Sequence, residues 1–290
     1  MTAQALNKAQ AFSNAQAFNK THVFKAERLV AGYDKKIVVN DVSMTIPDGK
    51  LSVIIGENAC GKSTLLKALM RLIKPVSGEI TLDGGNIDKL PPKKLARTVG
   101  LLPQSPVAPE GIAVADLVGR GRYPHQSLLC GWSREDALAV AEALDIMGVG
   151  DLADRCIDEL SGGQRQRVWI AMALAQRTDI LFLDEPTTFL DITYQVEILD
   201  LLTDLNRARG VTVVMVLHDI NLSARYADHI FAMHGGRLIA EGAPWDVITA
   251  ELIKEVFALD CTIIKDPVSH SPFLIPKGRH HVVSPVGETM

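Results

Sequence analysis

Residues 56–64 read Gly56-Glu57-Asn58-Ala59-Cys60-Gly61-Lys62-Ser63-Thr64, and this stretch decides the fold. It matches the pattern G-x-x-x-x-G-K-[ST], in which glycines let consecutive backbone N–H groups turn inward around a polyphosphate. In that pattern the following helix adds its positive end, Lys62 reaches the β- and γ-phosphates, and the Ser63 hydroxyl ligates Mg²⁺. The stretch therefore predicts a phosphate loop that binds ATP and Mg²⁺.

Short apolar runs before and after the loop predict strands that are buried on both faces. They are Leu51–Ile55, Ile180–Leu183 and Val211–Leu217. Directly after the loop, apolar residues share one face of a predicted helix: Leu65, Leu66, Leu69, Leu72 and Ile73. A strand, a glycine-rich turn, a helix and further strands predict an α/β domain with a largely parallel sheet.

The middle of the chain, roughly 107–160, has a helical pattern instead. Ser133 is a predicted N-cap because Asp136 follows three residues later. The predicted apolar stripe that follows ends at Gly148 and consists of Ala137, Val140, Ala141, Leu144 and Met147. We therefore expect a helical insert that interrupts the α/β core.

A second motif reads Ile180-Leu181-Phe182-Leu183-Asp184-Glu185-Pro186. An apolar strand of this kind delivers a carboxylate to the edge of the sheet, where Asp184 can hold Mg²⁺ directly or through water. Glu185 is then placed to polarise the water that attacks the γ-phosphate. Apolar strands often end in acids, so this motif gains its meaning from the phosphate loop.

A third motif reads Leu160-Ser161-Gly162-Gly163-Gln164. Ser161 can begin a helix whose exposed N–H groups and adjacent glycines offer a second anion cradle. One chain cannot easily use two cradles on one nucleotide. Two head-to-tail copies could, with each ATP held by one chain's phosphate loop and by Ser161, Gly162, Gly163 and Gln164 of the other.

The composition is that of a globular protein, with 290 residues of which 47% are hydrophobic and 22% charged. A net charge of -4 argues against a nucleic-acid binder, which normally has a basic face. No apolar run approaches the roughly 18 residues that cross a bilayer. The N-terminus also lacks the charged and apolar regions of a secretion signal, so we expect neither export nor a membrane span.

The chain has four cysteines and no C-x-x-C pair: Cys60, Cys130, Cys156 and Cys261. Scattered thiols suggest a reducing cytosol rather than a disulfide framework. The eight histidines show no metal-ligand spacing, so we expect no metal centre built from protein ligands alone.

Residues 3–20 form three related hexapeptides, each beginning Ala-Gln-Ala. A six-residue step turns a helix by about 600°, so the apolar residues Leu6, Phe12 and Phe18 would point in different directions. We interpret the segment as a disordered or loosely helical tail; contact with a membrane is the alternative.

Taken together and in this order, the motifs resemble the ATP-binding cassette (ABC) ATPases, over a segment from about Phe24 to Cys261. The resemblance implies an α/β fold with a P-loop NTPase core, an inserted helical subdomain and an antiparallel β subdomain. It divides the chain into a repeat tail at 1–22, an ATPase domain at 23–261 with the helical insert at about 107–172, and a C-terminal extension at 262–290.

The resemblance also implies roles for residues outside the three motifs. Tyr33 corresponds to an aromatic residue that stacks on adenine, and Gln104 to a glutamine that touches Mg²⁺ and links to the permease-facing helices. Asp191 belongs to a loop that crosses the dimer interface, and His218 contacts the γ-phosphate as part of the catalytic set with Glu185. Singly, a Tyr or His of this kind is more often a packing residue; their order carries the argument.

A narrower resemblance is to the ATPases of iron–siderophore importers, with cobalamin and haem importer ATPases as close relatives. It rests on these stretches: Gly119–His125, Thr187–Asp191, Leu259–Cys261 and Asp266–Val268. It implies a second copy of the chain, transmembrane permease subunits and, indirectly, an extracytoplasmic binding protein as partners. It also implies a peripheral position at the cytoplasmic face of the inner membrane, and no nucleic-acid partner.

Two other classes of protein are alternatives to a transporter ATPase. A soluble cassette ATPase acting on DNA would need long coiled-coil arms, but only about 120 residues separate the two nucleotide motifs. Translation-type relatives usually carry two cassettes in one chain, whereas this chain has one. An interaction module without catalysis is disfavoured because Lys62, Asp184, Glu185 and His218 are all present.

Cys60 lies inside the phosphate loop. One interpretation is a tolerated small side chain. The alternative hypothesis is a reactive thiolate, favoured by the positive local field, whose modification would block phosphate entry and which bound ATP would protect.

Overall fold

The computed structural model describes residues 21–34, 36–126, 131–188, 190–278 and 280. The hexapeptides at 3–20 lie outside the described residues, and their interpretation stays a prediction. None of the helices in the described ranges has both the length and the apolar character that a bilayer span requires.

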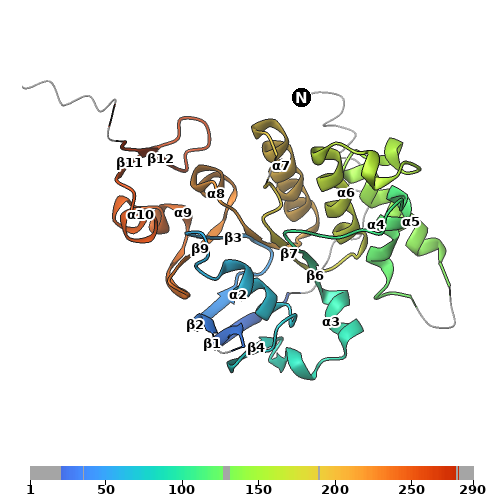
Figure 1. The fold of residues 1–290 in the computed structure, drawn as a ribbon, viewed down its shortest axis with the longest axis horizontal. Helices are drawn as coiled ribbons and strands as arrows, with labels where there is room; N and C mark the ends of the chain where they lie inside the picture. The colour runs from blue at the N-terminus through green and yellow to red at the C-terminus, as the bar shows by residue number, and fades with distance from the viewer. Residues whose placement is uncertain (1–20, 35, 127–130, 189, 279, 281–290) are drawn as a thin grey trace, which may run out of the picture.

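The described residues form both strands and helices (Figure 1). The strands are β1 (Phe24–Tyr33), β2 (Lys36–Ile46), β3 (Leu51–Gly56), β4 (Ser77–Leu82), β5 (Gly85–Asn86), β6 (Val99–Leu102), β7 (Ile180–Asp184), β8 (Thr212–Val216), β9 (His229–His234), β10 (Arg237–Gly242), β11 (Cys261–Lys265) and β12 (Pro272–Pro276). The helices are α2 (Lys62–Leu69), α3 (Pro92–Thr98), α4 (Val114–Gly119), α5 (Arg134–Ile146), α6 (Gly162–Ala175), α7 (Ile192–Arg209), α8 (Ile220–Tyr226), α9 (Pro244–Val247) and α10 (Ala250–Phe257). Short 3-10 turns are η1 (Ile87–Lys89), η2 (Arg120–Arg122), η3 (Gly150–Leu152) and η4 (Ile157–Glu159).

The central sheet has six strands in the order β10-β9-β3-β8-β7-β6. Strands β9, β3, β8, β7 and β6 run parallel, and β10 pairs antiparallel with β9. Every residue of β3, β7 and β8 is buried, as continuous apolar runs require in a sheet that is covered on both faces. The predicted largely parallel α/β sheet is therefore confirmed.

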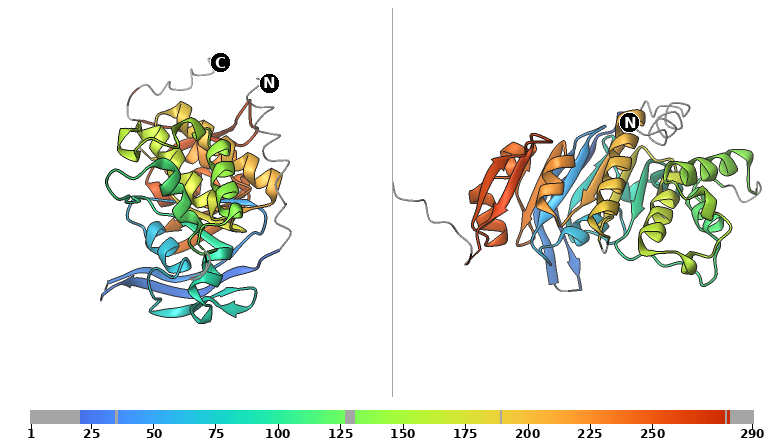
Figure 2. Two further views of the ribbon diagram at one scale, coloured as in Figure 1. Left: turned by 90° about the vertical axis from the view of Figure 1, so that its right-hand side faces the viewer. Right: turned by 90° about the horizontal axis from the view of Figure 1, so that it is seen from above.

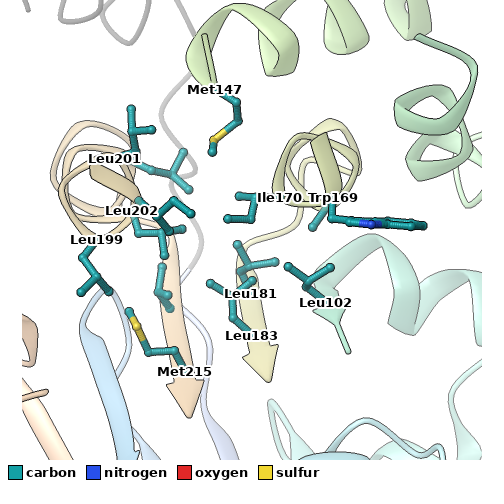
Figure 3. Close-up of a cluster of buried hydrophobic side chains, with 14 of the residues drawn as sticks. Leu102, Met147, Trp169, Ile170, Leu181, Leu183, Leu199, Leu201, Leu202 and Met215 are labelled. Carbon is teal, nitrogen blue, oxygen red and sulfur yellow. The ribbon is translucent and has the colours of Figure 1, made fainter. Parts of the chain in front are cut away.

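Alternate residues of these strands belong to two different cores. Leu181 and Leu183 of β7 face a cluster that includes Leu199 and Leu202 of α7 and Ile170 of α6 (Figure 3). Their neighbours in β7 face the opposite cluster, which contains α2 and the second sheet. Because successive side chains of a strand point to opposite faces, β7 contributes to the cores on both sides of the sheet.

The second sheet is antiparallel, with strand order β2-β1-β4-β5. It packs on the central sheet, where the ring centres of Phe24 and Phe182 lie 5.6 Å apart. Helix α2 contributes Leu65, Leu66 and Leu69 to this core. The predicted extension of that face was wrong at Leu72, which is exposed because α2 ends at Leu69.

Helices α4, α5 and α6 lie between β6 and β7 in the chain and gather at one end of the molecule (Figure 2). Ser133 caps α5 in a reciprocal capping box with Asp136, as predicted. The predicted stripe is wrong at Ala137 and Ala141, which are exposed. The buried face is rotated toward Ala139 and the residues that follow it at helical spacing, because α5 packs against both α4 and α6.

Strands β11 and β12 form a hairpin at the opposite end (Figure 2). Cys261 and Leu274 of this hairpin share a small core with Ile253 of α10. The predicted boundary after Cys261 falls within β11, since an antiparallel pair was not recognised in the sequence. The division of the chain into domains stays a prediction.

His22 joins three segments at the start of β1. Its Nδ1 lies 2.9 Å from Asp83 Oδ2, its Nε2 lies 3.0 Å from Asp179 Oδ2, and its backbone N–H donates to Asp48 Oδ1. Burial lowers the pKa of His22, but the hydrogen bonds and charges of the two carboxylates outweigh it, and the pKa lies above its usual value of 6.5. When the imidazole is protonated, it donates to both carboxylates and so joins the antiparallel sheet to the residue before β7.

A raised histidine pKa stabilises the folded chain fully below pH 6.5, and this contribution is lost as the pH rises through the folded-state pKa. We expect His22→Gln to lower the free energy of unfolding by about 1–3 kcal/mol near pH 5.5 and by less near pH 9, because the charge-assisted bonds exist only with a protonated ring. Urea unfolding of both proteins at the two pH values measures this. Equal losses at both values would contradict the clamp.

Candidate functional site

The phosphate loop connects β3 to α2 and depends on two glycines. Gly56 has a φ of 154°, and a Cβ there would lie 2.4 Å from the Met233 carbonyl oxygen. Gly61 has a φ of 107°, and a Cβ there would lie 3.0 Å from the Val38 carbonyl oxygen. Only glycine combines these conformations with such close approach of other backbone.

Lys62 lies at the centre of the loop. Its Nζ donates to the carbonyl oxygens of Gly56 and Glu57 at 2.9 and 2.8 Å, and the side chain is buried. An open pocket lies above it, lined by Lys36, Val38, Asn58, Ala59, Gly61, Lys62, Ser63, Thr64, Glu185 and His218. Six of the nine predicted loop residues therefore line the same pocket as the two predicted catalytic residues, whereas Gly56, Glu57 and Cys60 do not.

Asp184 is the last residue of β7 and precedes Glu185, which lines this pocket. Its Oδ1 accepts a hydrogen bond from Ser63 Oγ at 3.1 Å. Burial, with a contribution from the neighbouring charge of Glu185, raises the pKa of Asp184, although Ser63 and two nearby lysines oppose the shift. A carboxylate and a hydroxyl at this separation can both touch one hard cation at about 2.1 Å, so the pair fits Mg²⁺.

Glu185 follows in a left-handed backbone conformation, with a φ of 55°. Its carboxylate lies 2.6 Å from His218 Nε2 and accepts hydrogen bonds from Gln104 Nε2 at 2.7 Å and Thr188 Oγ1 at 2.9 Å. Burial raises its pKa, but these donors outweigh that effect and hold the pKa of Glu185 below its usual value. The carboxylate is thus kept ionised although it is almost fully buried.

The parallel sheet explains why these side chains meet. Gln104, Glu185 and His218 each come one or two residues after the end of β6, β7 and β8, respectively. Neighbouring parallel strands end at the same edge of a sheet, so residues from three distant parts of the sequence converge there.

The predicted second anion cradle lies at the start of α6. Ser161 Oγ accepts the backbone N–H of Gln164, and the Gln164 side chain accepts the backbone N–H of Ser161. A Cβ on Gly162 would meet nothing within 4 Å, so that side of the first turn is open. The residues lining the pocket above the phosphate loop include none of Ser161, Gly162, Gly163 or Gln164.

Two further predicted residues also lie outside that lining. Asp191 caps α7, where its Oδ1 accepts the backbone N–H of Tyr194 at 3.1 Å. Tyr33 is 45% exposed at the end of β1, and Lys67 Nζ lies 6.0 Å from its ring centre. Both side chains are exposed and can therefore contact a ligand or a second chain.

The sequence did not point to three residues of this site. Lys36 and Val38 line the pocket from β2, and Thr188 donates to Glu185. Thr188 could have been found from its position three residues after a candidate base, where a hydroxyl can reach back. The sequence carries no comparable signal for the two β2 residues, which come near only through the packing of the second sheet.

The hypothesis of a reactive Cys60 thiolate is wrong. The side chain is 4% exposed, and its Sγ lies 2.8 Å from where a Cβ on Gly56 would be. Burial raises the pKa of the Cys60 thiol, and Lys62 offsets this only in part. The thiol is packed into the core below the loop, so the positive field in front of the loop does not determine its charge.

The sequence model of the ABC transporter family matches residues 39–188. The chain belongs to this family. The ABC transporter match spans the phosphate loop, the second cradle and β7, which are the segments that build the geometry described above.

Curated ABC proteins match over nearly their whole length. The chain is 52% identical to "Probable siderophore transport system ATP-binding protein YusV" of Bacillus subtilis (strain 168), over 87% of this chain and 92% of that protein. It is 50% identical to "Ferric enterobactin transport ATP-binding protein FepC" of Escherichia coli (strain K12), over 88% and 94%.

Solved ABC structures share the fold. One is described as the "Dimeric structure of a post-hydrolysis state of the ATP-binding cassette MJ0796 bound to ADP and Pi". It superposes with a TM-score of 0.67 at 29% identity, covering 76% of this chain and 98% of that one.

The burial of Cys60 predicts low reactivity. In the native ABC chain at neutral pH, we expect iodoacetamide to modify Cys60 about tenfold or more slowly than in the urea-unfolded chain, because both the thiolate fraction and the access are reduced. Peptide mass spectrometry measures the rate, and half-buried Cys156 serves as an internal control for reagent activity. Equal rates for Cys60 in the folded and unfolded chains would contradict the structure.

Proposed function

We propose that this chain is the ATP-hydrolysing subunit of an ABC importer for iron(III)–siderophores, acting as a dimer on separate permease subunits. The siderophore cargo is proposed from sequence identity. About half of the aligned residues are identical to those of two ATP-binding proteins named for siderophore or ferric enterobactin transport. The alignments cover 87% and 88% of this chain and 92% and 94% of the two relatives, so the similarity is not limited to the nucleotide motifs.

The loop supplies the binding of ATP. The backbone N–H groups of the loop and the N-terminal end of α2 are proposed to complement the phosphate charge. The Lys62 ammonium, which donates to two loop carbonyl oxygens in this structure, is proposed to donate to phosphate oxygens when ATP binds. Tyr33 is proposed to stack on adenine beside the loop. Ser63, Asp184 and Gln104 are proposed to hold Mg²⁺, which would neutralise phosphate charge when bound.

Glu185 is proposed to act as the base for the attacking water. Its lowered pKa keeps it ionised and able to accept a proton, and His218 lies close enough to orient the carboxylate or the γ-phosphate. Gln104 and Thr188 fix the other carboxylate oxygen. Positioning and electrostatics of this kind supply most of the acceleration in phosphoryl transfer.

Two copies are proposed to close on two ATP molecules. The open cradle at Ser161–Gln164 then completes the site of the partner, and Asp191 lies at the interface between the copies. The support is that this cradle is open on the side of Gly162 and separate from the pocket of its own phosphate loop. A solved neighbour is a dimeric cassette bound to ADP and Pi.

The partners outside the dimer follow from the same proposal. The chain would sit peripherally at the cytoplasmic face of the inner membrane, bound to a transmembrane permease that is fed by an extracytoplasmic binding protein. Cargo selectivity resides in those partners. A cobalamin or haem importer is the second candidate, and a soluble cassette ATPase with no permease is the third.

Replacing the proposed base separates binding from turnover. We expect Glu185→Gln to keep ATP affinity but to reduce hydrolysis by about 10² to 10⁴, because one general-base contact is removed while the side-chain shape is kept. Steady-state ATPase assays and equilibrium nucleotide binding measure the two effects. Hydrolysis at a near wild-type rate would remove Glu185 from the proposed role.

Lys62→Ala gives the complementary result. Since its ammonium is proposed to hold the phosphates, we expect the affinity for MgATP itself to fall. Unchanged affinity would count against the phosphate-loop interpretation.

The cargo is tested in cells that depend on this chain. We expect uptake of radioactive iron supplied as ferric siderophore with the wild-type chain and none with Glu185→Gln, while uptake of labelled cobalamin and of haem is the same in both. Loss of cobalamin or haem uptake in place of iron uptake would overturn the siderophore assignment. Co-purification with a many-spanning membrane protein distinguishes an importer from a soluble ATPase.

A further inference from the structure

Tyr194, in the first turn of α7, lies against the start of α6. A Cβ built on Gly163 would be 3.3 Å from two atoms of the Tyr194 ring and 3.4 Å from a third. The three atoms are Cγ, Cδ1 and Cδ2, so this end of the Tyr194 ring lies close to the backbone of the turn. Gly163 is therefore buried, whereas Gly162 is exposed.

The ring is held from two sides. The backbone N–H of Tyr194 donates to Asp191 Oδ1, which fixes the start of α7. The Arg167 guanidinium lies 5.4 Å from the ring centre, within cation–π range, and Arg167 also pairs with Glu197 of α7. The ring is thus a wedge between the first turns of α6 and α7.

The sequence at the start of α6 needs such support. Two glycines in the first turn each cost roughly 1 kcal/mol relative to alanine, because glycine loses the most backbone freedom on folding. The capping box between Ser161 and Gln164 offsets part of this. The two glycines differ in surroundings: Gly162 is open, and Gly163 lies beneath the Tyr194 ring.

A second contact joins the same helix to the hydrolysis site. Gln166 Nε2 donates to the carbonyl oxygen of Pro186, the residue after Glu185. The start of α6 is therefore braced on the segment that carries the proposed base and, through Tyr194, on the segment that carries Asp191.

We infer that Tyr194 is a positioning residue for the second anion cradle: its ring holds the glycine-rich turn of α6 in helical form, so that the N–H groups of that turn are preorganised for the triphosphate bound to the partner. The inference rests on the proposed ATP-bound dimer. Because the ring does not line the pocket of its own phosphate loop, it acts on the partner's nucleotide and leaves the chain's own first binding step unchanged.

The test uses the full chain with Glu185→Gln, in which hydrolysis is slowed. Two quantities are measured: the affinity of the dilute monomer for a fluorescent ATP analogue, and the protein concentration at which MgATP drives dimer formation in sedimentation velocity. Adding Tyr194→Ala is expected to leave the first unchanged and to raise the second about tenfold, since directly packed neighbours couple by about 0.5–3 kcal/mol.

Matched variants separate positioning from stability. Tyr194→Phe keeps the ring and is expected to dimerise as the Glu185→Gln parent does. Tyr123→Ala removes an exposed tyrosine that directly follows the 3-10 turn η2 and is also expected to have no effect. If Tyr194→Ala loses its fold, as judged by circular dichroism, Tyr194→Leu replaces it, because a branched aliphatic group cannot lie flat on Gly163.

The outcomes are distinguishable. Failure of the Glu185→Gln parent to dimerise with MgATP would overturn the proposed function. A dimerising parent, combined with unaltered dimerisation of the alanine or leucine variant, would overturn the role of Tyr194 alone. A loss of monomer affinity together with dimerisation would also overturn it, because the effect would then not be specific to the cradle.

Discussion

The parallel pairing of β3, β8, β7 and β6 is the constraint on which the rest of the structure depends. It sets the carboxyl ends of four strands at one edge, so that the phosphate loop, Asp184, Glu185 and His218 leave the sheet side by side. The pairing is stable because both faces of the sheet are covered, by α6 and α7 on one side and by α2 and the antiparallel sheet on the other. The chemistry of the site is thus a consequence of strand order.

At that edge, burial and hydrogen bonding drive two adjacent carboxylates in opposite directions. The pKa of Asp184 is raised chiefly by burial, whereas donors from three segments lower the pKa of Glu185. A cation bound at Asp184 would remove the penalty of ionising it. The proposed base, in contrast, is ready without a cation, because the protein itself supplies the compensating donors.

Much of this could be predicted from the sequence, since the phosphate loop, the strand ending at Asp184 and the turn at Ser161 are local patterns with local physical causes. Contacts that arise from tertiary packing could not. Lys36 lines the pocket because the antiparallel sheet lies beside the loop. Tyr194 lies against Gly163 because the first turns of α6 and α7 are close together. Cys60 was misjudged for a related reason: sequence position put it in the loop, but its side chain points into the core. The stripe on α5 was rotated because two neighbouring helices, rather than one, determine which face is buried.

The central claim is that each nucleotide is held by the loop of one chain and the cradle of the other. Mixing two defective variants tests it most directly: Lys62→Ala lacks a working loop, and Gly162→Glu places a charge in the open side of the cradle, where a side chain meets no neighbour. In the mixed dimer, one site combines both defects and the other has none. With Glu185→Gln in both chains, the account predicts that neither variant alone forms a dimer that retains MgATP on gel filtration and that the mixture does. A mixture that retains no more nucleotide than its components would contradict the account.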